Sequence, residues 1–89
     1  MKEGFLYILQ SEKNGRYYIG STDDIARRLG EHNRGHTKST ANLVPWKLVF
    51  CQKYQSVVVA RQMELRLKKF KNREIIKRII IEQKIKAGL

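Results

Sequence analysis

The dipeptide Asn14-Gly15 constrains the fold more than any other feature of the sequence. It lies between two short runs rich in apolar and aromatic residues, Phe5–Leu9 and Arg16–Gly20. Asn-Gly favours a tight turn whose backbone twist matches that of two antiparallel strands. The first quarter of the chain is therefore predicted to form a β-hairpin.

Side chains alternate between the two faces of a strand, so the hairpin also predicts which residues share a face. If Asn14 and Gly15 are the two turn residues, Tyr7 and Tyr18 project from the same face, four residues apart along the strands. A bulge or curvature would have to bring them closer. The opposite face carries apolar positions typical of a core, which are Leu6, Ile8, Tyr17 and Ile19.

The rest of the chain predicts one more strand and three helices. A helix over about 23–33 follows candidate capping residues at 21–24, and residues 36–46 form a polar loop. The strand Lys47–Tyr54 is expected at the centre of the sheet because of its apolar run, and helices cover about 57–70 and 73–86. Apolar residues recur at helical spacing in these two helices, namely Ala60, Met63, Leu67 and Phe70, then Ile75, Ile76, Ile79 and Ile80. The predicted fold is a single α+β domain over residues 1–89, a small three-stranded antiparallel sheet flanked by helices in the order β-β-α-β-α-α.

The charge and cysteine content restrict the class of protein. The formal net charge of +11 on 89 residues favours a polyanionic partner, most simply a nucleic acid. The single cysteine, Cys51, cannot form an internal disulfide and is expected to be a buried strand thiol in a reduced, cytoplasmic protein. No apolar stretch is long enough to span a membrane, so no membrane association is expected.

Several short motifs occur in a characteristic order. Tyr18-Ile19-Gly20 is preceded by Phe5-Leu6-Tyr7, where Gly4 stands one place earlier than a Gly-x-Tyr motif would have it. They are followed by Arg27-Arg28-Leu29, Glu31-His32-Asn33, Lys38-Ser39-Thr40, Pro45-Trp46-Lys47 and the series Ala60, Glu64, Lys68. Over about residues 5 to 80 the chain resembles the GIY-YIG nuclease superfamily, specifically its small standalone bacterial branch.

The resemblance implies an endonuclease that hydrolyses DNA phosphodiester bonds with one divalent ion, Mg²⁺ or Mn²⁺, in DNA repair or processing. Glu64 is then the metal ligand and Arg28 holds the scissile phosphate. Tyr7 and Tyr18 orient or deprotonate the attacking water, which requires nearby positive charge to favour the phenolate. His32 serves as a general base or a phosphate contact.

The resemblance also implies that further residues bind nucleic acid, namely Arg27, His36, Lys38, Lys68 and Asn72. The substrate is expected to be DNA, including branched or single-stranded forms, with a protein partner as one source of specificity. Two alternatives to an endonuclease remain open. The first is a nucleic-acid-binding module that has lost turnover, which the displaced Gly4 favours. The second is a basic structural domain, which leaves the polar residues unexplained.

Overall fold

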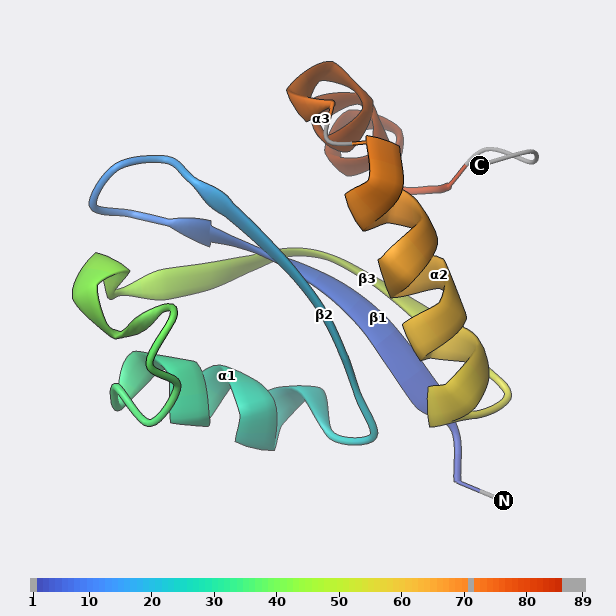
Figure 1. The fold of residues 1–89 in the computed structure, drawn as a ribbon, viewed down its shortest axis with the longest axis horizontal. Helices are drawn as coiled ribbons and strands as arrows, with labels where there is room; N and C mark the ends of the chain where they lie inside the picture. Colours follow the sequence, from blue (N-terminus) through green and yellow to red (C-terminus); the bar gives the residue numbers. More distant parts are fainter. Residues whose placement is uncertain (1, 71, 86–89) are drawn as a thin grey trace.

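A computed structural model describes residues 2–70 and 72–85 and confirms the α+β class and the order of elements (Figure 1). The elements are β1 (Gly4–Ser11), β2 (Tyr17–Thr22), α1 (Ile25–Asn33), the short 3₁₀ turn η1 (Ala41–Leu43), β3 (Trp46–Tyr54), α2 (Val57–Phe70) and α3 (Arg73–Glu82). None of the helices in this part of the chain has the length and apolar character that crossing a membrane requires.

The three strands form an antiparallel sheet in the order β2-β1-β3. The prediction that the third strand lies at the centre is wrong, because β1 occupies that position. The reason is visible in β1, where Leu6 and Ile8 are buried on one face and Tyr7 and Leu9 on the other, none of them more than 2% exposed. In β3 the apolar run is buried on one side only, and Cys51 is exposed rather than buried.

The turn between β1 and β2 is longer than the two residues predicted. The Ser11 amide donates to the Arg16 carbonyl at 2.8 Å, so residues 12–15 form the turn. Gly15 adopts a left-handed conformation with φ of 78°, which glycine accepts without steric cost. The Ser11 hydroxyl accepts hydrogen bonds from the Lys13 and Asn14 amides, which stabilises this wider turn.

The wider turn shifts the register of the hairpin by two residues. Tyr7 pairs with Gly20 and Leu9 pairs with Tyr18, so the two tyrosines lie two residues apart instead of four. A shift of two keeps every side chain on its predicted face. The turn therefore brings the tyrosines together without a bulge between β1 and β2.

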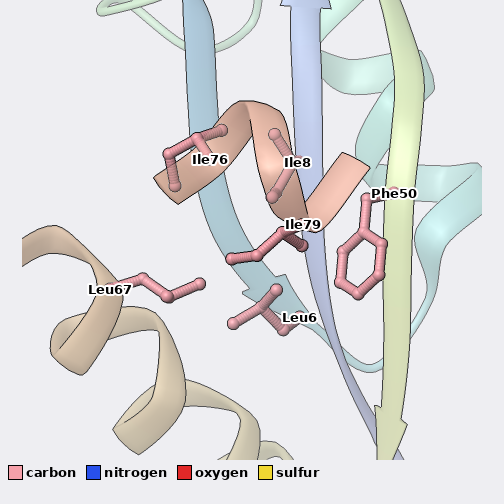
Figure 2. Close-up of a cluster of buried hydrophobic side chains, with 6 residues drawn as sticks. All are labelled: Leu6, Ile8, Phe50, Leu67, Ile76 and Ile79. Carbon is pink, nitrogen blue, oxygen red and sulfur yellow. The ribbon is translucent and has the colours of Figure 1, made fainter. Parts of the chain in front are cut away.

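One face of the sheet carries the larger core, which α2 and α3 cover (Figure 2). Its buried members are Leu6, Ile8, Phe50, Leu67, Ile76 and Ile79. The predicted apolar stripes of both helices are confirmed except for Phe70, which is 47% exposed at the last position of α2. The last helix ends at Glu82, earlier than predicted, before Gln83 in a left-handed conformation; residue 86 of the prediction lies outside the described residues.

The other face packs against α1. Ile25 and Leu29 of this helix contact a smaller cluster that contains Tyr7, Leu9 and Trp46. The helix begins at Ile25. The carboxylate of Asp24, its N-cap residue, accepts a hydrogen bond from the Arg27 amide at 3.0 Å. The sheet thus separates two packed layers, and side chains from both layers lie next to its edge strand β2.

The backbone of β1 passes very close to the backbone at the start of α2. A Cβ at Gly4 would clash with the backbone of Ser56 and Val57, which has little freedom to move. We expect Gly4→Ala to lower the free energy of unfolding by about 1–3 kcal/mol, measured by urea denaturation. Gly30→Ala in α1 is the matched control, since its Cβ would meet only the mobile end of Arg34. The control is expected to raise stability by up to about 1 kcal/mol, and equal effects at the two positions would contradict this account.

Candidate active site

Tyr7 lies at the centre of the candidate site, beneath the edge strand. Its ring crosses β2 at Gly20, and a Cβ at position 20 would clash with the phenol. The side chain is 2% exposed, and its hydroxyl oxygen lies 3.1 Å from Nε2 of His32. The glycine of the Tyr-Ile-Gly motif is therefore required for the tyrosine of the neighbouring strand to reach α1.

His32 continues this hydrogen-bond chain into the loop after α1. Its Nδ1 lies 2.8 Å from the Thr40 hydroxyl, which donates to the Thr37 carbonyl at 3.3 Å. Since the Thr40 proton is used in that bond, Nδ1–H donates to Thr40, and Nε2 accepts the proton of the Tyr7 hydroxyl. Sequence reasoning missed Thr40, whose position in a polar loop carries no signal of this contact.

His32 is fully buried, with 0% of its surface exposed. Burial lowers its pKa, and the neighbouring Arg28 charge lowers it further. The imidazole is therefore neutral at pH 7, as its acceptor role toward Tyr7 requires. Tyr7, Tyr18 and Thr40 surround the ring.

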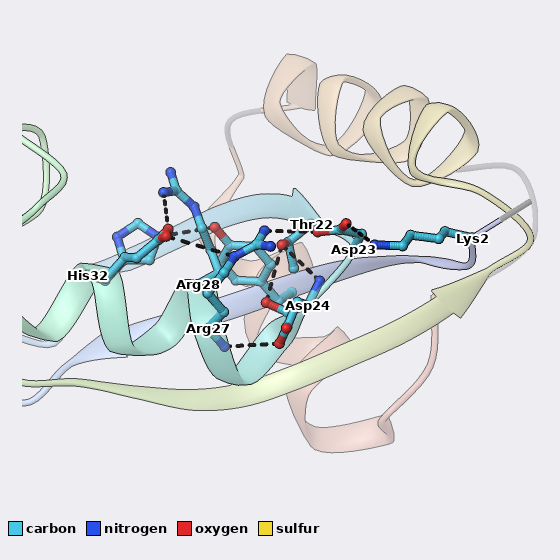
Figure 3. A network of polar contacts seen from close by, with 9 residues as sticks. Lys2, Thr22, Asp23, Asp24, Arg27, Arg28 and His32 are labelled. Atoms are coloured by element: carbon cyan, nitrogen blue, oxygen red, sulfur yellow. Dashed lines mark hydrogen bonds and ion pairs between the residues drawn. The ribbon is translucent and has the colours of Figure 1, made fainter.

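Arg28 lies on α1 one turn before His32 (Figure 3). A hydrogen bond connects its side chain to the Tyr7 hydroxyl. Its Nη1 donates to Glu31 at 2.9 Å, and its pKa is raised by this bond and by the bond to Tyr7. The side chain is 31% exposed, so part of the guanidinium faces solvent. Arg28 is thus a charged donor held in place from both sides and still accessible to an anion.

Tyr18 forms the outer wall of the site. Its ring centroid lies 6.3 Å from that of Tyr7 and 4.8 Å from that of His32, in an edge-on arrangement with the imidazole. Lys68 Nζ of α2 lies 5.8 Å from the centroid of the Tyr18 ring. Unlike Tyr7, Tyr18 is only partly buried, and it stands between cations from α1 and α2.

Glu64 reaches the site from the opposite face of the sheet. It is 5% exposed, and its two carboxylate oxygens accept from the Ser21 hydroxyl and from Lys68 Nζ, each at 2.6 Å. Its charge is close enough to Tyr7 to raise the pKa of the phenol. The free edge of β2 is therefore where two tyrosines, one arginine and one glutamate come together. Ser21 is a second missed residue, since the sequence suggested only a helix cap.

The donor set can be compared with what a divalent ion needs. Among residues 2–70 and 72–85 no group of three or more His, Cys, Asp or Glu side chains could hold a metal. A Mg²⁺ ion needs less, because it is usually bound through one or two carboxylates and keeps several waters. Glu64 fits that mode, provided that the Lys68 ammonium leaves Oε2; this side chain is 45% exposed and has room to move.

The protonation of Tyr7 differs from the expectation. Burial raises its pKa to about 12, and the nearby Tyr18 and Glu64 act in the same direction. The Arg28 hydrogen bond opposes this shift without cancelling it. The Arg28 charge alone therefore does not favour a phenolate at Tyr7, whose protonated hydroxyl donates a hydrogen bond to His32.

The residues predicted to bind nucleic acid lie in different places. Arg27 forms ion pairs with Asp23 at 2.8 Å and Glu31 at 3.8 Å, and His36 and Lys38 are exposed on the loop after α1. Lys68 adjoins the site, as described. Asn72 caps α3, its side chain accepting from the Glu74 amide at 2.9 Å.

Comparison with known proteins identifies a family for the chain. The family model described as the GIY-YIG catalytic domain matches residues 3–78. A UPF0213 protein of Streptococcus pneumoniae is 39% identical over 70 residues, which are 78% of this chain and 70% of the relative. A UPF0213 protein of Listeria welshimeri is 37% identical over 68 residues, 75% of this chain and 74% of the relative.

The relatives that are named as endonuclease subunits match over a smaller part of their own length. The structure-specific endonuclease subunit SLX1 of Meyerozyma guilliermondii is 42% identical over 67 residues, which are 66% of this chain and 22% of that protein. The SLX1 of Phaeosphaeria nodorum is 45% identical over 47 residues, 47% of this chain and 13% of that protein. No solved structure matches the chain significantly.

The buried imidazole predicts how stability depends on pH. Because the pKa of His32 is lower in the folded state than its ordinary 6.5, the unfolded chain binds more protons as the pH falls through 6.5. The free energy of unfolding is expected to be constant above that pH and to decrease below it, by up to about 1.4 kcal/mol per pH unit until the folded-state pKa is reached. Urea denaturation between pH 7.5 and 5 measures this.

His32→Gln removes the titrating group and is expected to flatten the curve in this range. His36→Gln, at the exposed histidine, is the control and should leave the curve as in the wild type. A wild-type curve that is already flat between pH 7.5 and 5 would contradict the buried neutral imidazole.

Proposed function

The chain belongs to the GIY-YIG family, and on that premise we propose that it is an endonuclease that hydrolyses phosphodiester bonds in DNA with one Mg²⁺ or Mn²⁺ ion. One observation carries the proposal, the grouping of Arg28, Tyr18 and the Glu64–Lys68 pair at the free edge of β2. Phosphodiester hydrolysis needs a group beside the attacking water, positive charge around the phosphate and help for the leaving oxygen. These residues supply groups of each kind.

Arg28 is the residue best placed to hold the scissile phosphate. Its guanidinium is partly exposed and is oriented by Glu31 and by the Tyr7 hydroxyl. A planar fork of donors held in advance stabilises the charge that develops on the phosphoryl oxygens at little reorganisation cost. Of the predicted residues on α1, Arg27 is less suitable because it pairs with Asp23 at 2.8 Å, whereas Arg28 also bonds to Tyr7.

Tyr18 is the phenol that faces the attacking water in this proposal. It is the more exposed of the two tyrosines, and the Arg28 and Lys68 cations flank its ring. Negative charge that develops near its hydroxyl or on the phosphate is therefore stabilised from two sides. Its hydroxyl oxygen accepts a hydrogen bond from the water and so orients it for attack on phosphorus.

Tyr7 and His32 are positioning residues. Both are almost completely buried, so neither contacts substrate directly. Tyr7 holds the Arg28 guanidinium through its hydroxyl oxygen, while His32 accepts the hydroxyl proton and packs its ring against Tyr18. This chain of contacts sets the distance between the arginine and the outer tyrosine.

Glu64 is the residue that would hold the divalent ion. Ser21 orients one of its oxygens, and the other becomes available when Lys68 moves away. When bound, such an ion supplies Lewis-acid stabilisation of the phosphate and of the leaving oxygen. The released Lys68 ammonium stays near the phosphate as an additional positive charge.

The relatives named structure-specific endonuclease subunits favour DNA with an irregular structure as the substrate. Their name also describes them as subunits, which supports the proposal that a protein partner supplies specificity to this chain. The net charge of +11 is consistent with a polyanionic substrate.

The proposal predicts the effect of removing its two charged groups. Arg28→Gln and Glu64→Gln are each expected to slow metal-dependent nicking of DNA by a factor on the order of 10²–10³, because each removes a charge that acts on the transition state. The assay incubates purified protein with plasmid, flapped and branched DNA in Mg²⁺, Mn²⁺ or chelator. Circular dichroism melting checks that the variants remain folded.

Two surface variants control for charge alone. Arg78→Gln and Glu74→Gln change exposed residues of α3, away from the grouping at β2, and should cleave like the wild type. Wild-type protein that binds DNA without cleaving any of these substrates would instead select the binding module without turnover.

The Lys68–Glu64 pair predicts a competition between the ammonium and the metal. Lys68→Met is expected to lower the Kd for Mn²⁺ by about tenfold, since it removes a cation 2.6 Å from the carboxylate while keeping the length of the side chain. Isothermal titration calorimetry without DNA measures this. Lys69→Met, at the exposed neighbour, is the matched control, and a Kd that rises or stays unchanged in Lys68→Met would contradict the competition.

A further inference from the structure

A groove runs along the free edge of β2, beside the candidate active site. It has a volume of about 450 Å³ and lies between β2 and the junction of α2 with α3. We call it the β2-edge groove; its principal lining residues are Arg16, Tyr17, Leu67, Lys68, Asn72 and Arg73. Pockets of this size accommodate small organic groups such as a nucleotide.

The β2-edge groove is positively charged and has aromatic walls. Arg16, Lys68 and Arg73 line it, and no carboxylate is among its described lining residues. The Arg73 guanidinium lies 4.7 Å from the centroid of the Tyr17 ring and donates to the Gly15 carbonyl at 3.2 Å. This guanidinium is therefore held at the groove before any ligand arrives, and Arg16 is exposed close to it in the lining.

The groove is continuous with the site through two residues. Lys68 lines the groove and pairs with Glu64, while Tyr18 lines it from the strand and faces His32 on the other side. Arg16, just before β2, and Gly20, where Tyr7 crosses, are four positions apart, which is about 13 Å along an extended strand. A phosphate near Arg16 then lies within a few nucleotides of the scissile phosphate along the same DNA strand.

We propose that the β2-edge groove binds the segment of the DNA strand that flanks the scissile phosphate. The flanking phosphate lies between Arg16 and Arg73, and its sugar and base pack against Tyr17. A basic groove interleaved with aromatic side chains is the combination that follows a nucleic-acid strand without reading its sequence. The proposal rests on the proposed function, and it adds Arg16, Tyr17 and Arg73 to the residues that contact the substrate.

Binding measured without chemistry tests this groove. The background is Glu64→Gln in chelator, and the probes are a fluorescein-labelled duplex and one of its single strands, followed by anisotropy over a range of salt concentrations. In Arg16→Gln/Arg73→Gln the Kd is expected to rise at least about tenfold, as two phosphate contacts are lost. The slope of log Kd against log salt should fall by about 1.8 for the duplex and about 1.4 for the single strand.

A matched double variant removes the same charge elsewhere. Lys47→Gln/Arg78→Gln changes exposed residues of β3 and α3 that do not line the groove, and its salt slope should stay at the wild-type value. Equal losses in the two double variants would overturn the groove, since they would show only the effect of net charge. Displacement of the labelled DNA by poly-glutamate as readily as by unlabelled DNA would overturn it as well, in favour of an acidic peptide.

The outcome for the groove is separable from that of the cleavage assay. Protein that binds DNA through Arg16 and Arg73 yet never nicks it supports the groove while refuting the nuclease. If the protein nicks DNA and its Kd for DNA is unchanged in Arg16→Gln/Arg73→Gln, the groove is refuted while the nuclease stands.

Discussion

The hydrogen bond between the Tyr7 hydroxyl and Nε2 of His32 connects the three parts of the structure on which the candidate site depends. Tyr7 belongs to the central strand, His32 to α1, and Thr40, on the other imidazole nitrogen, to the loop that follows. A polar group buried without a partner costs free energy, and in the hydrogen-bond series Tyr7–His32–Thr40 each donor has an acceptor. In the described part of the protein no buried side-chain nitrogen or oxygen lacks a partner. The positions of Arg28 and of the Tyr18 ring both follow from this arrangement.

The edge strand β2 is where the two layers of the protein can act together. A sheet normally separates the residues of its two faces, so Arg28 under one face and Glu64 over the other would not meet. Both nevertheless act on Tyr7, because β2 is the last strand and because Gly20 leaves space for the Tyr7 ring to cross it. The edge also remains open toward the α2–α3 junction, where the β2-edge groove lies. One strand therefore borders both the reacting groups and the proposed path of the substrate.

Sequence reasoning succeeded where the signal was local and periodic. Helical spacing identified the buried stripe of α3, and alternation placed Tyr7 and Tyr18 on one face even though the predicted turn was too short. It failed where burial depended on position in the whole sheet. The apolar run around Phe50 suggested a central strand, but in the edge strand β3 Phe50 is the one residue of the run 48–51 that is buried. Cys51 and Phe70, predicted to be buried, are exposed for the same kind of reason, since periodicity does not show where the neighbouring element ends.

By itself the sequence determined the class of fold, the family and the types of side chain available for chemistry, because these depend on short-range patterns and on ordered motifs. Only the tertiary structure decided how those side chains divide the work. It buried Tyr7 and His32 and left Tyr18 and Arg28 accessible, and it placed Lys68 on the carboxylate of Glu64. It also decided that Arg27 pairs with Asp23 while Arg16 and Arg73 line a groove. Burial, proton sharing and charge pairing are properties of distances between residues far apart in the chain, and no local pattern encodes those distances.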